Sequence, residues 1–143
     1  MRPTETVVDE RLEIYIDGAS KGNPGHSGVG IIICHNQRVL RNISRYIGTA
    51  TNNVAEYTAL IYSLEEALLM KAKRLLIKTD SELLYRQIKK EYKVRHPAIL
   101  ALYNQALRLM QGFHKVDVMH IPREENSGAD KLASSAAKKH AKE

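Results

Sequence analysis

The chain has 143 residues, of which 43% are hydrophobic and 27% charged, and its formal net charge is +6. This length fits one domain with a hydrophobic core, and no stretch approaches the roughly 18 consecutive apolar residues that a membrane span needs. The positive charge favours a polyanionic partner such as nucleic acid.

The N-terminus and the single cysteine bear on location. Residues 1–10 contain no apolar run, so we expect a flexible leader and not a secretory signal, followed by one domain over residues 11–143. Cys34 has no partner for an internal disulfide and lies in an apolar run, so we expect a buried, inert thiol. Without signal or cystine, the chain is expected to be cytoplasmic.

The first predicted element is a strand over residues 12–17, where apolar residues recur with period two. It ends on an acid, Asp17, and a glycine-rich turn over Gly18 to Gly25 follows. Glycines let the backbone approach a ligand closely, so this arrangement suits a metal or phosphate site. The alternative is a solvated acid before an ordinary turn, and this stretch alone does not decide between them.

Two more strands and a helix come next. The strands Gly28 to Cys34 and Val39 to Tyr46 are joined at His35 to Arg38, which we interpret as a hairpin turn. The loop Thr49 to Asn53 can cap the following helix. That helix has apolar residues on nearly all sides, so we expect it to be largely buried. Its apolar residues include Val54, Tyr57, Ile61, Leu64 and Leu68.

Strands and helices alternate in the second half. The expected elements are a strand over Arg74 to Asp80, a helix over Ser81 to Glu91, a helix from Pro97 to Gly112, a strand over Val116 to Ile121 and a helix over Glu124 to Lys139. In the first of these helices we expect Leu83, Leu84 and Ile88 to face inward. The order βββαβααβα predicts an α/β fold with a mixed, helix-covered sheet.

Four acids lie at or near the ends of these elements: Asp17, Glu56, Asp80 and Asp130. If the first and fourth strands are parallel neighbours, Asp17 and Asp80 lie side by side where sites form in α/β proteins. Glu56 falls in the first turn of the buried helix, and Asp130 comes four residues after Asn126, so that this pair shares one face of the last helix. Each acid alone could instead cap a helix, favour a helix dipole or be solvated.

Converging carboxylates point to a metal. They repel one another unless cations lie between them. Hard oxygen ligands suit Mg²⁺ or Mn²⁺, and the chain has no His/Cys cluster with zinc spacing. In a basic protein this is the arrangement of two-metal phosphodiester chemistry, in which acids hold the metals and basic residues hold the strand.

Four blocks stand out, in this order: YIDGASKGNPG (Tyr15 to Gly25), TNNVAE (Thr51 to Glu56), TDS (Thr79 to Ser81) and NSGADKLA (Asn126 to Ala133). They resemble the signature blocks of type 1 ribonuclease H, and the resemblance runs from about residue 11 to residue 138. It implies a ribonuclease H-like fold, with a five-stranded mixed sheet in order 3-2-1-4-5 and helices on both faces. The element order read from the sequence agrees with that fold.

The resemblance also implies an activity. It makes the four acids metal-binding catalytic carboxylates, in a family that uses two Mg²⁺ ions to cut the RNA strand of an RNA–DNA hybrid. The products carry 5′-phosphate and 3′-hydroxyl ends. One ion lowers the pKa of the attacking water and the other stabilises the leaving oxygen. Asp17 would bridge the two ions, and Glu56 could accept a hydrogen bond from a ribose 2′-hydroxyl.

The resemblance implies substrate contacts as well. Asn23, Asn52 and the turn Gly18-Ala19-Ser20 would contact the RNA minor groove, Asn53 would lie nearer the DNA strand, and Thr51 would lie at a phosphate. Turn and cap chemistry alone is the alternative for the asparagines.

The sequence departs from the family pattern in three places. The segment His120 to Asn126 is shorter than the loop that carries a product-release histidine in many bacterial members, and we place His120 in the fifth strand. After Ser81 the chain is too short for the extra helix and basic protrusion of longer enzymes. Basic residues that replace the protrusion in part are Lys89, Lys90, Lys93 and Arg95. Glu82 stands where many relatives have a substrate-contacting glutamine, which puts that contact in question.

The leading hypothesis is a metal-dependent endoribonuclease acting on RNA–DNA hybrids. A DNA nuclease of the resolvase or transposase type shares the fold and is the second reading. A hybrid-binding module without turnover is the third. The asparagine and glutamate constellation argues against the second, and the presence of all four acids argues against the third. We expect a monomer, with no membrane or protein partner evident.

Overall fold

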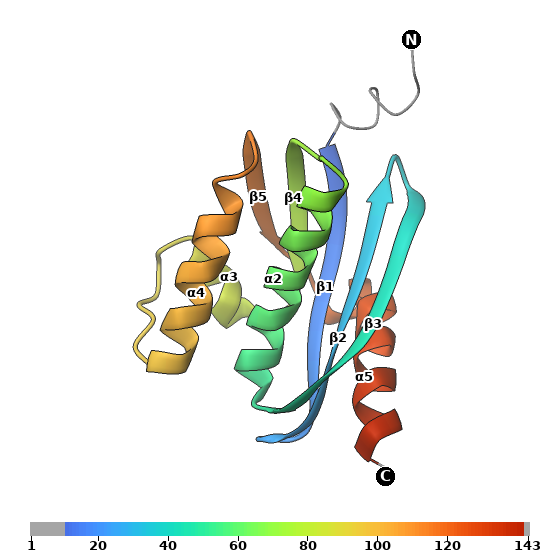
Figure 1. The fold of residues 1–143 in the computed structure, drawn as a ribbon, viewed down its shortest axis with the longest axis vertical. Coiled ribbons are helices and arrows are strands. Elements are labelled where there is room, and N and C mark those ends of the chain that lie inside the picture. The colour runs from blue at the N-terminus through green and yellow to red at the C-terminus, as the bar shows by residue number, and fades with distance from the viewer. Residues whose placement is uncertain (1–10, 142–143) are drawn as a thin grey trace.

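The computed structural model describes residues 11–141, so the leader expected over residues 1–10 lies outside the described residues. The chain forms a five-stranded sheet with helices on both faces (Figure 1). Its elements are β1 (Arg11–Gly22), β2 (Gly25–His35), β3 (Arg38–Ala50), α2 (Asn52–Leu69), β4 (Arg74–Thr79), α3 (Glu82–Ile88), α4 (Pro97–Met110), β5 (Lys115–His120), the 3-10 helix η1 (Arg123–Glu125) and α5 (Ser127–Ala141). The predicted order βββαβααβα is confirmed, with η1 as an addition.

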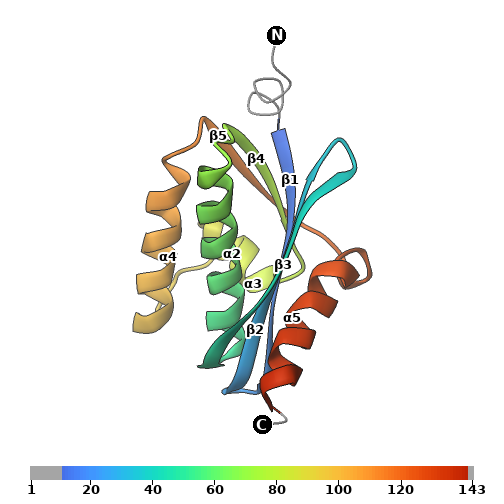
Figure 2. The ribbon, with the colours of Figure 1, turned by 45° about the vertical axis from the view of Figure 1, so that its right-hand side comes forward.

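The sheet has the strand order β3-β2-β1-β4-β5, as predicted. β2 is antiparallel to β1 and β3, whereas β4 is parallel to β1 and β5 to β4. α2 and α4 cover one face, and α5 lies on the other (Figure 2). Because β1 and β4 are parallel neighbours, residues that follow β4 emerge beside β1.

The first strand is longer than the sequence predicted. β1 continues through Asp17 and pairs with β2 as far as Gly22 opposite Gly25, so the expected glycine-rich turn is reduced to Asn23 and Pro24. The prediction was wrong because small residues can continue an antiparallel ladder, which uses only backbone groups. What ends near Asp17 is the pairing with β4, whose last register pair is Ile16 and Thr79.

Both strands of the following hairpin, β2 and β3, are also longer than predicted, although the hairpin itself was predicted correctly. Asn36 and Gln37 form the turn with φ of 50° and 67°, as a tight primed turn requires. β3 then runs to Ala50, so only Thr51 is left between β3 and α2. The Thr51 hydroxyl accepts a hydrogen bond from the backbone N–H of Val54 and caps α2, as expected.

The helix after β4 is shorter than predicted. α3 ends at Ile88, and Lys90, with φ of 64°, cannot continue it. Leu84 is buried as expected, but Leu83 is 37% exposed, and the prediction for it was wrong. The buried Gln87 lies on the inner side instead and accepts a hydrogen bond from the hydroxyl of Tyr57.

The helices on either side of β5 show two further differences. α4 begins at Pro97 as predicted but ends at Met110, two residues before Gly112. The final helix begins at Ser127, not at Glu124, because Asn126 has φ of −115° and ψ of 21°, which interrupts the helical path. Asn126 therefore precedes α5, and Asp130 lies in the first turn of α5.

The core lies between the sheet and α2, where apolar residues of β1, β2 and β4 are fully buried. On the other face α5 approaches β2 very closely. A Cβ atom added at Gly30 would lie 2.0 Å from the carbonyl oxygen of Ala129, so only glycine fits there. This contact brings the start of α5 to the sheet. Among the described residues, no helix is both long and apolar enough to span a membrane.

Candidate active site

Three of the four predicted acids meet where β1 leaves β4. Asp17, Glu56 and Asp80 each place a carboxylate oxygen within 4.8 Å of the other two. The three side chains come from the middle of β1, from α2 and from the residue after β4. Asp17 is only 5% exposed, so the group is recessed in the molecule.

Glu56 is held by the close packing of α2 on β1. The backbone N–H of Gly18 donates to Oε1 of Glu56 at 2.9 Å. A Cβ atom at Gly18 would lie 2.3 Å from the backbone carbon of Ala55, so glycine is required for this approach. Because α2 begins at Asn52, Glu56 lies in its second turn, not in the first turn as predicted.

The residues on either side of Asp80 make the capping contacts at the start of α3. The hydroxyl of Ser81 accepts from the backbone N–H of Leu84 and caps α3, so Asp80 is not the cap. The hydroxyl of Thr79 in turn accepts from the backbone N–H of Ser81 at 3.0 Å. The carboxylate of Asp80 therefore remains available to the cluster.

Asp130 lies at the border of this group. It is not one of the three acids whose oxygens converge within 4.8 Å. Asp130 nevertheless contributes to the raised pKa of Asp17, and its charge acts on both Glu56 and Asp80. The structure thus brings all four predicted acids to one place, with Asp130 on the α5 side.

The cluster strongly disfavours its own ionisation. Burial, followed by the charges of Glu56 and Asp80, raises the pKa of Asp17 from 3.8 to about 9. Burial and the charge of Asp80 raise the pKa of Glu56 from 4.5 to about 8, although the hydrogen bond from Gly18 opposes this. Burial also raises the pKa of Asp80. A recessed set of three carboxylates, with only oxygen donors, fits a hard divalent cation.

Two residues of this site were not assigned roles in advance. The positive charge of Arg123 in η1 opposes the rise in pKa of Glu56 and Asp80. Asn126 is 1% exposed, and its side-chain Nδ2 donates to the carbonyl oxygen of Ile16 at 2.9 Å. Asn126 was noted for its spacing from Asp130 and as the first residue of the block NSGADKLA, without a role of its own, and no pattern around Arg123 distinguishes it from a surface arginine.

The predicted substrate-contacting residues fall into two groups. Asn23, Thr51, Asn52 and Asn53 line a hollow of about 660 Å³, to which His96, the residue before α4, also contributes. Oδ1 of Asn23 accepts from the backbone N–H of Asn52 at 3.0 Å, which ties the β1–β2 turn to α2.

The second group is part of β1. Gly18, Ala19 and Ser20 pair with β2 and do not form a turn. The hydroxyl of Ser20 donates to the carbonyl oxygen of Ala50 at 2.9 Å and also to that of Gly22. This group is therefore built into the sheet beside Asp17.

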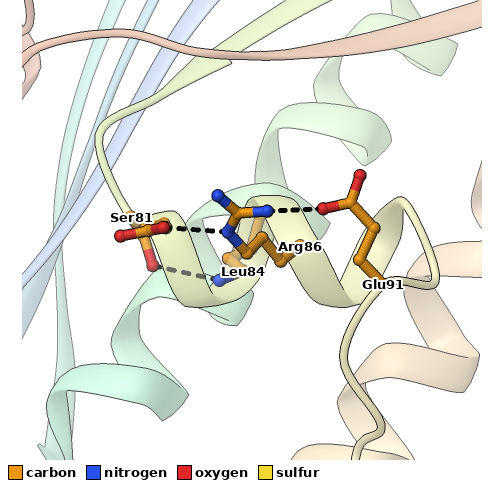
Figure 3. A network of polar contacts seen from close by, with 5 residues as sticks. Ser81, Leu84, Arg86 and Glu91 are labelled. Carbon is orange, nitrogen blue, oxygen red and sulfur yellow. Dashed lines mark hydrogen bonds and ion pairs between the residues drawn. The ribbon is translucent and has the colours of Figure 1, made fainter.

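The residues at which the sequence departs from the family have partners of their own. His120 ends β5, as predicted, and stacks on Tyr85 with ring centroids 5.8 Å apart. Glu82 accepts a hydrogen bond from Arg86 at 2.8 Å, and Arg86 also reaches Glu91 at 2.7 Å, beside the Ser81 cap (Figure 3). The charge of Glu82 is thus balanced within α3.

Known proteins resemble the chain over most of its length. The family model described as "Reverse transcriptase-like" matches residues 15–136. The "Bifunctional protein Rv2228c" of Mycobacterium tuberculosis is 39% identical over 128 residues, which cover 88% of this chain and 35% of that protein. The "Ribonuclease HI" of Halobacterium salinarum is 35% identical, over 88% of this chain and 64% of that protein. The chain thus spans about a third of the first relative and under two thirds of the second.

The chain is also similar to solved structures of ribonuclease H1 proteins. The crystal structure of RNase H1 from Halobacterium salinarum has a TM-score of 0.88 at 34% identity and covers 91% of this chain and 99% of its own. The structure of LC11-RNase H1 in complex with an RNA/DNA hybrid has a TM-score of 0.86 at 36% identity, covering 90% and 98%.

Proposed function

The chain belongs to the type 1 ribonuclease H family, and from that premise we propose that it is a metal-dependent endoribonuclease that hydrolyses the RNA strand of RNA–DNA hybrids. The observation that carries the proposal is the convergence of the carboxylates of Asp17, Glu56 and Asp80 within 4.8 Å. The proposal treats residues 11–143 as a single catalytic domain.

The metal site of the proposal consists of Asp17, Glu56 and Asp80, with Asp130 as a fourth ligand on the α5 side. Two Mg²⁺ ions, or Mn²⁺ in their place, would activate water and stabilise the leaving 3′ oxygen, giving 5′-phosphate and 3′-hydroxyl ends. Asp17 is the most central of the acids, since its pKa is raised by the charges of all three others. It is therefore the bridging ligand of the proposal.

The remaining residues of the site orient these carboxylates. The N–H of Gly18 fixes one oxygen of Glu56, which holds that side chain at the point where RNA would present its 2′-hydroxyl. The pairing of β1 with β4 ends at Ile16, so the side of β1 away from β2 would be open to a ribose beyond Asp17. We assign Gly18, Ala19 and Ser20 to contacts with the RNA strand on this basis.

The hollow beside the site would receive the nucleic acid backbone. Asn23 and Asn52 would contact the RNA minor groove, Asn53 would lie nearer the DNA strand, and Thr51 would lie at a phosphate. The lining of the hollow combines hydrogen-bonding side chains with apolar ones and contains no acid, so nothing in it would repel a phosphate. The exposed cations after α3 would extend the contact to further phosphates. They are Lys89, Lys90, Lys93 and Arg95.

The proposal further describes a monomer that acts in the cytoplasm. The support for the location is Cys34, which is a free, buried cysteine, as expected in a reducing compartment.

Cleavage of end-labelled duplexes tests the function. Matched RNA–DNA hybrid, RNA duplex and DNA duplex are incubated with the protein in Mg²⁺, in Mn²⁺ and in a chelator. The proposal predicts cleavage of the RNA strand of the hybrid alone, lost with the chelator, and products with 3′-hydroxyl ends. Cleavage of the DNA duplex but not of the hybrid would indicate the resolvase-type alternative. Hybrid binding without cleavage in either metal would indicate the inactive module.

A further inference from the structure

Asn126 lies between the segments that carry Asp17, Asp80 and Asp130, the three acids of the site other than Glu56. Its side-chain Nδ2 donates to the carbonyl oxygen of Ile16, the residue before Asp17, at 2.9 Å. Its backbone carbonyl oxygen accepts from the N–H of Asp130 at 3.0 Å. One buried residue therefore ties β1 to the first turn of α5.

The same side chain also reaches Asp80. Burial raises the pKa of Asp80, and the hydrogen bond from the side chain of Asn126 is the strongest influence against that rise. An amide nitrogen has two hydrogens, so Nδ2 can serve both the carbonyl oxygen of Ile16 and the carboxylate of Asp80. Asn126 thus contacts the backbone beside Asp17 and the backbone of Asp130, and its side chain counteracts the rise in the pKa of Asp80.

The chemistry of its partners fixes which way the amide points. The carbonyl oxygen of Ile16 and the carboxylate of Asp80 are both acceptors, so a reversed amide would place oxygen against oxygen at both. Oδ1 of Asn126 is buried and has no hydrogen-bond partner within residues 11–141. An unpaired buried oxygen is unfavourable, and an apolar side chain of similar size would avoid it. A role in packing alone does not account for an asparagine here.

We propose that Asn126 is a positioning residue that holds Asp17, Asp80 and Asp130 at the separation that a divalent cation requires. The inference rests on the proposed function. Asn126 does not touch the nucleic acid, because it is only 1% exposed. Its effect would appear in metal affinity and turnover, and not in hybrid binding.

The test compares the wild type with Asn126→Ala and Asn126→Leu. Asn126→Leu keeps most of the volume but removes both donors, so it separates hydrogen bonding from packing. Asn104→Ala is the matched control, because Asn104 is exposed on α4 and away from the cluster. For each protein, Mg²⁺ affinity is measured by calorimetry without substrate, kcat and KM are measured on a hybrid, and Tm is measured without metal.

We expect both Asn126 variants to bind Mg²⁺ about 10- to 100-fold more weakly, the usual effect of losing a partner that orients a metal ligand. Because Mg²⁺ binds more weakly, kcat at a fixed low Mg²⁺ concentration should fall and should recover as the Mg²⁺ concentration is raised. KM for the hybrid should stay within about twofold of the wild-type value. A lower Tm with unchanged Mg²⁺ affinity and kcat would overturn the proposal and leave a structural role only. Full retention of affinity by Asn126→Leu would do the same.

A second measurement needs no variant. In ¹⁵N-labelled wild type, the side-chain NH₂ group of Asn126 should exchange slowly with solvent and shift in a saturable way as Mg²⁺ is added, whereas that of Asn104 should do neither. An Asn126 signal that behaves like that of Asn104 would contradict the proposal even if both variants failed to fold. Absence of hybrid cleavage by the wild type would refute the proposed function separately, because Mg²⁺ binding and the NMR shift are measured without substrate.

Discussion

At the scale of single residues, the negative charge of Asp17 is unfavourable in the metal-free protein. Its carboxylate is buried against Glu56 and Asp80, and its pKa of about 9 lies far above the ordinary value of 3.8. Strand formation does not require an acid at this position, and placing three carboxylates together lowers the stability of the metal-free protein. Such a cluster is typical of a functional site.

The first prediction concerns the charge of Asp17. Between pH 4 and 9 the folded state binds more protons than the unfolded state, so the stability of metal-free wild type should fall as pH rises. Asp17→Asn removes this charge with little change of volume. We expect the variant to be more stable than wild type at pH 8, by on the order of 1 kcal/mol or about 4 °C in Tm.

Thermal unfolding from pH 4 to pH 9 in a chelator checks this. The gain should shrink as the pH falls towards 4, because below the ordinary pKa of 3.8 the carboxyl is protonated in both the folded and the unfolded protein, and it should also shrink when Mg²⁺ is present. Hybrid cleavage by Asp17→Asn should drop by about 10²- to 10³-fold or more. A variant that is less stable than wild type at pH 8 without metal would contradict the electrostatic account.

The second prediction concerns Arg123, whose charge opposes the rise in pKa of Glu56 and Asp80. Arg123→Ala should destabilise the metal-free protein at pH 8 and low salt by about 0.5–1 kcal/mol, since the residue is exposed and screened. The loss should fade as the pH falls to 4, because the raised pKa of both carboxyls favours their neutral forms there, and it should also fade in high salt. Arg95→Ala, which removes an exposed arginine elsewhere, is the control. A loss that is the same at both pH values would indicate a packing effect.

At the scale of elements, the closeness of α5 to β2 brings Asp130 to the other acids. A Cβ atom at Gly30 would meet the carbonyl oxygen of Ala129 at 2.0 Å, whereas one at Gly128 would meet only the end of the Ile32 side chain at 2.6 Å. The backbone of α5 cannot move aside locally, but the tip of an isoleucine can. The two glycines therefore respond differently to the same added methyl group.

The third prediction uses this contrast. Gly30→Ala should destabilise the protein by about 1–3 kcal/mol through overpacking and should lower kcat, because α5 and Asp130 are pushed away from β1. Gly128→Ala should cost about 1 kcal/mol or less, because a side-chain tip gives way and alanine favours helix. Denaturant unfolding and steady-state cleavage measure both. Equal effects of the two substitutions would contradict the assigned role of the close contact.

The segment after α3 is held in a defined path. Arg86 bonds Glu82 and Glu91 and lies 5.5 Å from the ring centre of Tyr92, while Nε2 of Gln87 donates to the carbonyl oxygen of Lys93. Exposed cations on this segment are thus presented by ordered backbone. An ordered basic segment can track a nucleic acid backbone without first being immobilised.

The fourth prediction tests this segment. The double variant Lys89→Gln and Lys90→Gln should weaken hybrid binding, and the slope of log affinity against log salt should fall by about 2 in magnitude. Lys73→Gln with Lys115→Gln is the matched control, because those lysines lie at the start of the β4 and β5 region, away from the catalytic end of β4. Binding is measured by fluorescence anisotropy in Ca²⁺. An unchanged salt slope would exclude the segment from the interface.

At the scale of the whole molecule, periodicity and topology rules were sufficient for the architecture but not for its boundaries. The period of two in β1 and the apolar residues of α2 predicted both elements, and the element order agreed with the sheet order 3-2-1-4-5. The end of β1 was missed because an antiparallel ladder continues through small residues whose side chains carry no signal. The start of α5 was missed because η1 resembles helix in composition.

The site was predictable to a similar extent. All four acids were singled out by their places at or near element ends, parallel strands predicted that Asp17 and Asp80 lie side by side, and the resemblance implied their metal-binding role. Arg123 and Asn126 escaped because they act through tertiary contacts with Glu56, Asp80 and Ile16, which no local pattern encodes. Spacing in the sequence indicates which groups meet, whereas the contacts that hold them in place appear only in three dimensions.

The central claim is that Asp17, Glu56 and Asp80 together bind the catalytic metal. Anomalous diffraction from crystals of the protein grown with Mn²⁺ tests it most directly, with crystals of Asp17→Asn as the comparison. We expect an anomalous peak between the three carboxylates in the wild type and a weaker or missing peak in the variant. A wild-type crystal with full Mn²⁺ occupancy elsewhere and no peak between these carboxylates would contradict the account.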